Sequence, residues 1–176
     1  MTGHLSPKDA LLAELPSLRA FAMSLTGSHD RADDLVQETL MKAWSAYASF
    51  TEGTSLRAWL FTIMRNSFFS THRKQRREVQ DVDGLAAARM VSSPAQLGHL
   101  DLADFRDALA TLAPDQREAL ILIGASGFSY EEAAEICGCA VGTIKSRVNR
   151  ARQRLMQILS IETAEDLGPD PIAAAG

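Results

Sequence analysis

The sequence predicts an all-α protein with two small helical domains joined by a flexible linker. First, apolar residues recur at offsets of three and four through most of the chain, which is the spacing of amphipathic helices. Second, no stretch shows the alternation of a β-strand. Third, residues 78–100 have weak periodicity and contain Gly84 and Ser92-Ser93-Pro94, which is typical of a linker. We therefore place the domains at residues 8–77 and 101–162, with a frayed tail over 163–176.

The composition is that of an ordinary globular chain. It has 176 residues, of which 46% are hydrophobic, and no apolar run approaches the ~20 residues that span a bilayer. The N-terminal MTGHLSPKDALLAEL lacks a basic start followed by an apolar block, so we expect no secretory signal. We therefore expect a cytoplasmic protein with no membrane partner.

Positive charge is concentrated in two short segments of an otherwise acidic chain. Residues 73–77 contribute four basic side chains and residues 145–154 contribute five, although the formal net charge is −4. The rest of the chain has nine basic and 22 acidic residues. This separation predicts two local anion-binding surfaces on a body that repels DNA, and it excludes a uniformly basic, histone-like protein.

Two helical stretches are expected before the first loop. Apolar residues recur from Lys8 to Leu25, where Pro16 marks a break or a fresh start. A second helix begins near Asp30 and includes Trp44 among its apolar residues. Four polar side chains share one exposed side of it, because offsets of three and four face the same way. Solvation is the simplest interpretation of that side, which comprises Asp33, Asp34, Gln37 and Glu38.

A long helix that ends in positive charge follows the loop. Phe50 to Ser55 forms the loop, and Ser55 caps a helix that runs from Leu56 to Arg77. Its aromatic residues have two possible roles: they stack unpaired bases while the charge follows a phosphate backbone, or they fill a core. We expect most of them to be core, namely Trp59, Phe61, Phe68 and Phe69.

The second domain contains a helix-turn-helix pattern. Helices are expected over Asp101 to Leu112 and from Pro114, because proline favours the first position of a helix. A capping box of Ser129 and Glu132 then starts a short helix. Gly138 tolerates the left-handed backbone that ends such a helix.

The last helix is amphipathic and basic. It begins near Val141, and its apolar stripe comprises Val141, Ile144, Val148, Ala151, Leu155 and Ile158. Its other faces carry basic and polar residues, with no acid from Val141 to Met156. In a helix-turn-helix the second helix enters the major groove of DNA, where arginine, lysine, asparagine and serine reach phosphates and base edges. A solvated face on an ordinary helical hairpin is the alternative, and the position of the turn favours DNA binding.

Metal binding and enzymatic chemistry are not expected. Cys137 and Cys139 lie inside the helix-turn-helix and have no second pair to complete a metal site, so we interpret them as core or turn residues. The sequence contains no nucleophile with a nearby base and no phosphate-binding loop. We therefore predict a protein without cofactor or catalytic residues.

The two halves together resemble one family. The segments DRADDLVQETLMKAW, SLRAWLFTIMRNSFFSTHRK and LAPDQREALILIGASGFSYEEAAEICGCAVGTIKSRVNRARQRL are similar to those of extracytoplasmic-function sigma factors, which are promoter-recognition subunits of bacterial RNA polymerase. The segments FTEGTSLRAWLFTIMRN and GFSYEEAAEICGCAVGTIKSRVNRAR further resemble those of the general-stress-response sigma factors of alphaproteobacteria. The resemblance implies sigma region 2 at residues 8–77 and sigma region 4, with its helix-turn-helix, at residues 101–162.

The resemblance also implies a role for each surface and a set of partners. It assigns polymerase docking to Asp33, Asp34, Gln37 and Glu38, and minus-ten recognition to Asn66, Arg73 and Lys74. It assigns minus-thirty-five recognition to Thr143, Lys145, Ser146, Arg147 and Arg150. The implied partners are core RNA polymerase, promoter DNA and a small soluble anti-sigma factor. The implied function is to direct polymerase to stress-response promoters and to help initiate transcription.

Three other functions compete with this one. A sigma-like decoy that binds an anti-sigma factor is expected to carry a receiver domain and to lack a coherent DNA-reading surface, whereas this chain has five basic residues over 145–154. An ordinary helix-turn-helix regulator leaves the acidic cluster and the basic aromatic helix unexplained. An enzyme is the weakest alternative, for the reasons given above.

Overall fold

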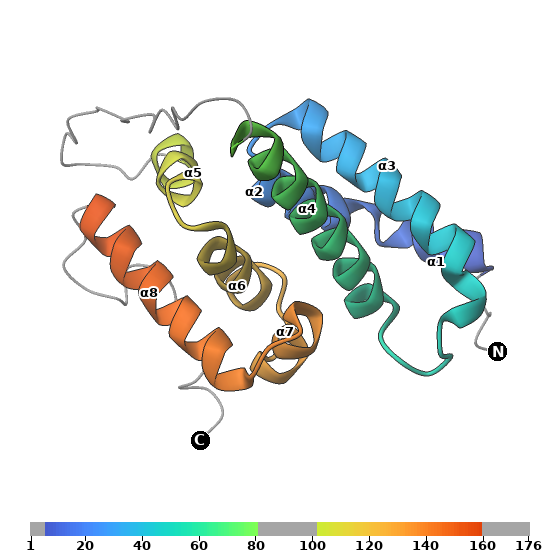
Figure 1. The fold of residues 1–176 in the computed structure, drawn as a ribbon. Helices are drawn as coiled ribbons and strands as arrows, with labels where there is room; N and C mark the ends of the chain where they lie inside the picture. The colour runs from blue at the N-terminus through green and yellow to red at the C-terminus, as the bar shows by residue number, and fades with distance from the viewer. Residues whose placement is uncertain (1–5, 81–101, 160–176) are drawn as a thin grey trace, which may run out of the picture.

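The computed structural model describes residues 6–80 and 102–159, and within these ranges the chain is helical with no strand (Figure 1). The N-terminal half comprises α1 (Pro7–Ala13), α2 (Leu15–Thr26), α3 (His29–Ala46), the short 3₁₀ turn η1 (Tyr47–Ser49) and α4 (Leu56–Gln80). The C-terminal half comprises α5 (Leu102–Ala110), α6 (Pro114–Gly124), α7 (Tyr130–Cys137) and α8 (Val141–Leu159). The predicted all-α class is confirmed.

The helix boundaries differ from the predicted ones at a few places. The fresh start near Pro16 occurs at Leu15, and Pro16 lies in the first turn of α2, where its missing N–H has no helical partner to lose. The long basic helix α4 continues past Arg77 to Gln80, so it takes the first three residues of the predicted linker. The remainder of that linker and the predicted tail lie outside the described residues.

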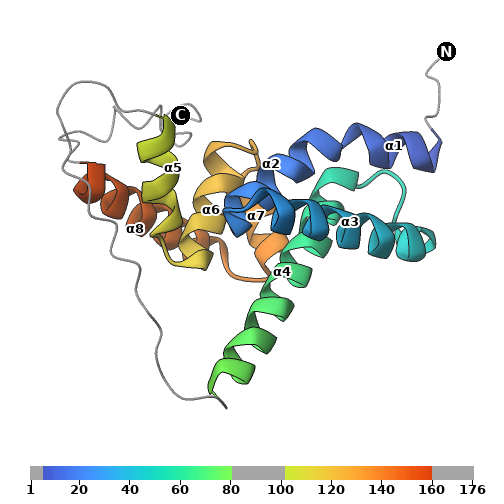
Figure 2. The same ribbon diagram turned by 90° about the horizontal axis from the view of Figure 1, so that it is seen from above.

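The N-terminal half is organised around the packing of α2, α3 and α4, which lie side by side (Figures 1 and 2). Leu60, Phe61 and Met64 of α4 are fully buried, and Trp59 and Phe69 are half-buried against the same core. Phe68 is also buried. The expectation that these aromatic residues are core is therefore confirmed by their burial.

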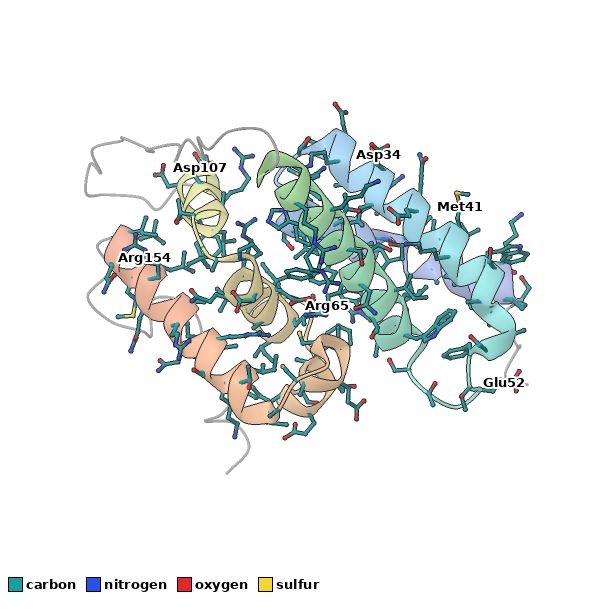
Figure 3. The ribbon with its side chains drawn as sticks, viewed as in Figure 1. Asp34, Met41, Glu52, Arg65, Asp107 and Arg154 are labelled. Atoms are coloured by element: carbon teal, nitrogen blue, oxygen red, sulfur yellow. The ribbon has the colours of Figure 1, made fainter. Side chains whose placement is uncertain are left out.

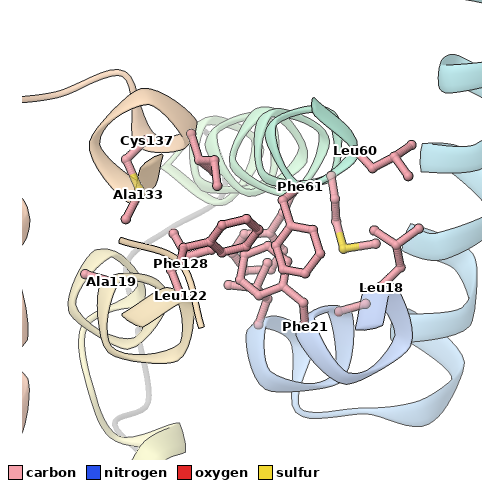
Figure 4. Packing of buried hydrophobic residues seen from close by; sticks show 14 of the residues in the cluster. Leu18, Phe21, Leu60, Phe61, Ala119, Leu122, Phe128, Ala133 and Cys137 are labelled. Atoms are coloured by element: carbon pink, nitrogen blue, oxygen red, sulfur yellow. The ribbon is translucent and has the colours of Figure 1, made fainter. Parts of the chain in front are cut away.

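The two halves share one apolar core, which the sequence did not predict (Figure 4). Helix α4 contacts α7, and α2 contacts α6. Phe61 stacks on Phe21 of α2 with ring centroids 4.6 Å apart, and its ring also meets the edge of Phe128, which precedes α7, at 5.0 Å. Phe61 is thus in contact with both halves at once.

A buried ion pair accompanies this shared core. Nε of Arg65 on α4 lies 2.9 Å from Oε1 of Glu118 on α6, and Glu118 is fully buried, with 0% of its side chain exposed. Burial raises the pKa of Glu118 to about 7, and the positive charges of Arg65 and Arg147 oppose that rise. A carboxyl group in such a place depends on its partner, because an unpaired charge is costly inside a protein.

Candidate nucleic-acid and polymerase interfaces

Helices α7 and α8 form the predicted helix-turn-helix. The backbone N–H of Glu132 donates to Oγ of Ser129 at 3.1 Å, and the N–H of Ser129 donates to Oε2 of Glu132 at 2.8 Å, so the capping box is complete. Helix α7 ends at Gly138, which has a φ of 62°, a conformation that glycine adopts without strain. Val141 begins α8 two residues after Cys139, and these features confirm the predicted turn.

The apolar stripe of α8 anchors it to the rest of the C-terminal half. Ile144, Val148, Ala151 and Leu155 are buried as predicted, whereas Val141 and Ile158 at the two ends are half-buried. The stripe packs on α5, α6 and α7. The opposite side of α8 is therefore exposed, and from Gly142 onwards it presents Gly142, Thr143, Lys145, Asn149, Arg150 and Gln153.

Most of the predicted minus-thirty-five residues lie on that exposed side. Thr143, Lys145 and Arg150 are exposed, and Ser146 is half-buried beside them. The ammonium group of Lys145 lies 5.7 Å from the ring centroid of Tyr130 on α7, where a cation–π contact orients it. These four residues form a coherent polar and basic surface.

Arg147 does not lie on that surface, contrary to the expected exposed basic face. Its Nε is 3.2 Å from Oδ2 of Asp115 in the first turn of α6, and only 22% of its side chain is exposed. Its Nη1 also lies 3.8 Å from Sγ of Cys139. Arg147 thus holds α8 against α6.

The spacing of Arg147 in the sequence already indicates that its side chain is partly covered. Arg147 is three residues after Ile144 and four before Ala151, so it borders the buried stripe. Asn149 is four residues after Lys145 and is exposed, which places it on the reading side. Asn149 is a further candidate on this side that the resemblance does not include, although its spacing places it there.

The predicted minus-ten residues are exposed along α4. Asn66 is exposed, and its Oδ1 lies 3.4 Å from Nη1 of Arg65. Arg73 and Lys74 follow two turns later and are also exposed. At the other end of α4, the half-buried rings of Tyr47, Phe50 and Trp59 pack on one another, with the centroids of Phe50 and Trp59 5.3 Å apart. This aromatic cluster supports the loop over residues 50–55.

The acidic residues of α3 form one exposed face. Asp33, Asp34 and Gln37 are exposed on α3. Glu38 is less exposed because it pairs with Lys42, whose ammonium group also donates to Oγ of Ser67 on α4 at 2.9 Å.

The same helix exposes two large apolar side chains. Met41 is 72% exposed and Trp44 is 59% exposed, which differs from the expectation that Trp44 belongs to the apolar side of this helix. Residues 33, 37, 41 and 44 are spaced by four, four and three, so they follow one stripe along α3. The acidic face therefore continues into an apolar patch. Amphipathic surfaces of this kind are typical of protein interfaces.

A shallow cavity of about 200 Å³ separates this face from the end of α4. Asp34 and Glu38 line it from α3, and Phe68, His72 and Gln75 line it from α4. The rings of Phe68 and His72 stack with centroids 5.8 Å apart. Part of the acidic face of α3 and the C-terminal part of α4 thus line one surface hollow.

The described residues give no indication of metal or membrane binding. Within residues 6–80 and 102–159, no three metal-ligating side chains come together, and no helix is long and apolar enough to cross a bilayer. Cys137 is buried, and burial raises the pKa of its thiol to about 12, so the thiol stays protonated.

Comparisons with known proteins match both halves. Residues 11–78 match sigma-70 region 2, and residues 102–155 match sigma-70 region 4. The ECF RNA polymerase sigma factor EcfG of Rhodopseudomonas palustris is 61% identical over 170 residues, which cover 97% of this chain and 94% of that protein.

Solved structures give the same assignment. The sigma factor RpoE of Bartonella quintana, in complex with the anti-sigma factor NepR, is 62% identical, with a TM-score of 0.77 over 89% of this chain and 98% of that one. The anti-anti-sigma factor PhyR of the same organism, also bound to NepR, is 22% identical, with a TM-score of 0.56, and this likeness shows only a common fold. Because relatives of high identity span both of its regions, the chain belongs to the ECF sigma factors of the sigma-70 family.

Proposed function

We propose that the chain directs RNA polymerase to stress-response promoters and helps to initiate transcription there. The observation that carries this proposal is 61% identity to the sigma factor EcfG over 97% of the chain, which includes both sigma regions. The exposed side of α8 supports it, since polar and basic side chains on the second helix of a helix-turn-helix suit the major groove.

In this proposal the two regions divide promoter recognition between them. Thr143, Lys145, Ser146 and Arg150 read the minus-thirty-five element, and Asn149 joins them because it lies on the same exposed side. Asn66, Arg73 and Lys74 act on the minus-ten element, where an amide reads a base and the cations contact phosphates. Because both regions are held on one polymerase, binding of one promoter element raises the effective concentration of the other, so neither contact needs high affinity alone.

Core polymerase is proposed to dock on the acidic face of α3. Asp33, Asp34, Gln37 and Glu38 offer carboxylate and amide groups to a basic partner surface, and Met41 and Trp44 extend the contact with apolar area. Protein interfaces usually combine apolar contact area with charged and polar groups, as this stripe along α3 does. Docking of polymerase would explain why α3 exposes large apolar side chains beside its acidic residues.

A small soluble anti-sigma factor is the proposed regulator, because the similar RpoE of Bartonella quintana forms a complex with NepR. A decoy function is less well supported, since the anti-anti-sigma factor PhyR is only 22% identical. The exposed reading side of α8 also favours a chain that contacts DNA itself.

Run-off transcription with purified components tests this function. Core RNA polymerase, the chain and a library of randomised promoters should give transcripts whose templates share two elements. Polymerase without the chain should give none of these transcripts. A chain that binds an anti-sigma factor but never supports transcription would show that the decoy alternative is correct.

We predict different effects for Arg147→Ala and Asn149→Ala. Since Arg147 pairs with Asp115, its loss should weaken all promoters about equally and lower the melting temperature by about 3–6 °C. Asn149→Ala should instead relax preference at one base pair, with a loss of about 1–3 kcal/mol on the preferred promoter.

The exposed Arg154 on α8 provides the matched control for these two variants. Arg154→Ala should weaken all promoters without a change in melting temperature. If Arg147→Ala relaxes selectivity at one position and leaves the melting temperature unchanged, Arg147 leaves Asp115 to read a base, as first expected from the sequence.

A further inference from the structure

A second surface groove lies in the C-terminal half, where α8 passes the start of α6. Its volume is about 330 Å³. The turn before α6 and the first turn of that helix form one wall, and the exposed side of α8 forms the other. The described residues that line it are Thr111, Leu112, Ala113, Gln116, Arg150, Gln153, Arg154 and Gln157.

The groove is positively charged. Arg150 and Arg154 line it, and none of its described lining residues is acidic. Neither guanidinium has an ion pair in the part of the chain that the structure describes, although Nη1 of Arg154 lies 3.4 Å from Oε1 of Gln157. Gln116 and Gln153 add amide groups, which can donate hydrogen bonds to an anion. The groove therefore suits an anionic occupant that reaches both arginines.

The groove continues the proposed reading side of α8. Arg150 belongs to both, and the three other α8 residues of the groove follow it at offsets of three, four and seven, so they share its face. One of them, Arg154, lies near the C-terminal end of α8 (Figure 3). The groove thus extends from the reading residues towards Leu159, where α8 ends.

The segment that follows α8 has the opposite charge. Residues 160–176 contain four acidic side chains and no lysine, arginine or histidine. The acids are Glu162, Glu165, Asp166 and Asp170. Because this segment is joined directly to α8, its carboxylates are present at the groove at an effective concentration in the millimolar range. It is therefore an anionic occupant that the chain itself supplies.

The length of the segment permits the contact. Arg150 is nine residues before Leu159 on α8, which is about 14 Å along the helix at 1.5 Å per residue. An extended chain covers about 3.3 Å per residue, so the eleven residues from Ser160 to Asp170 reach up to about 36 Å. The segment is therefore long enough to turn back at the end of α8 and pass both arginines.

We propose that the acidic segment 160–176 folds back into this groove and competes with DNA phosphates for Arg150 and Arg154. The competition with DNA rests on the proposed function, whereas the contact itself is a property of the free chain. Exposed ion pairs are individually worth little, so the contact depends on several carboxylates and on their attachment to α8. Such a contact is weak enough for a promoter to displace.

The competition acts mainly against weak complexes. DNA without promoter elements is held by its phosphates alone, and those phosphates must displace the segment. A promoter also gains base contacts from Thr143, Lys145 and Asn149, which do not line the groove. Both affinities fall by the same factor, but non-specific complexes are lost first because they are the weaker ones.

Heteronuclear NMR of the free full-length chain, without polymerase or DNA, tests the contact. Wild type is compared with a neutral-tail variant that carries the substitutions Glu162→Gln, Glu165→Gln, Asp166→Asn and Asp170→Asn. The side-chain N–H signals of Arg150, Arg154 and Gln153 should shift between the two proteins, and signals of α3 should not. Added salt should move the same signals of wild type in the same direction, because it screens the contact.

Fluorescence anisotropy with a labelled random-sequence DNA duplex measures the competition. The neutral-tail variant should bind roughly tenfold more tightly than wild type at low salt. The two proteins should differ by less than about twofold at high salt, since screening removes the segment from the groove.

The double variant Asp9→Lys/Asp30→Lys is the matched control. Both acids are exposed, on α1 and α3, and the two reversals raise the formal net charge from −4 to zero, as the neutral tail does. This variant should leave the groove signals unchanged and raise DNA affinity by less than about twofold. Circular dichroism should show full helicity in both variants.

Unchanged groove signals in the neutral-tail variant would show that the segment does not enter the groove. Groove shifts without a gain in DNA affinity, or an equal gain in the control, would overturn the competition. Wild-type groove signals that depend on protein concentration would place the segment of a second copy in the groove, contrary to the proposal. A failure of the run-off assay with wild type would contradict the proposed function and leave the NMR result unchanged.

Discussion

Phe61→Ala is expected to lower the free energy of unfolding by about 3–5 kcal/mol, because truncation of a fully buried aromatic ring removes its contacts and leaves a cavity. Phe61 loses two ring contacts at once, the stack on Phe21 at 4.6 Å and the edge contact with Phe128 at 5.0 Å. Chemical denaturation followed by circular dichroism measures the change.

Trp44→Ala is the control for this prediction. Trp44 is a larger aromatic residue but is 59% exposed on α3, so its removal should change stability by no more than about 0.5 kcal/mol. Equal losses for the two variants would contradict the placement of Phe61 at the centre of the core. Proteolysis of Phe61→Ala should also start earlier in both halves, since both contact this ring.

Asp34→Lys is expected to weaken the binding of core RNA polymerase roughly 100-fold, which corresponds to about 3 kcal/mol. The reason is electrostatic: Asp34 is exposed on the proposed docking face, and a lysine there meets the basic partner surface with like charge. Fluorescence anisotropy of labelled chain titrated with core polymerase gives the affinity.

Asp107→Lys makes the same charge reversal on α5, away from α3 (Figure 3). It should leave polymerase affinity within about twofold of wild type, since it lies outside the proposed interface. Both variants should keep full helicity. If Asp34→Lys binds polymerase as tightly as Asp107→Lys does, the acidic face of α3 is simply solvated, the first interpretation from its spacing.

Much of the fold was predictable because its signals are local. The capping box of Ser129 and Glu132 and the terminating Gly138 define α7 within a few residues, without reference to the rest of the chain. The stripe from Ile144 to Leu155 defines the buried side of α8 in the same way. Such features depend on neighbours three or four residues away, so a sequence displays them directly.

The candidate surfaces were predictable only in part. Exposure of Lys145, Arg150 and Asp34 agrees with the expected polar faces. The side chain of Arg147 is less exposed than expected, because it pairs with the carboxylate of Asp115, which is 32 positions earlier on another helix. Trp44 is more exposed than expected, because the spacing of apolar residues in α3 does not reveal which of them a neighbouring helix will cover.

The sequence by itself determined the positions of the helices, the helix-turn-helix and the two basic segments, since periodicity, caps and charge runs are properties of consecutive residues. Only the tertiary structure decided that the two halves share a core through Phe61 and Phe128, and that Arg65 pairs with Glu118. The physical reason is that the sequence of an amphipathic helix specifies which face must be buried, but it does not specify which partner buries that face. That choice depends on contacts between residues far apart in the chain, where shape and charge must match together.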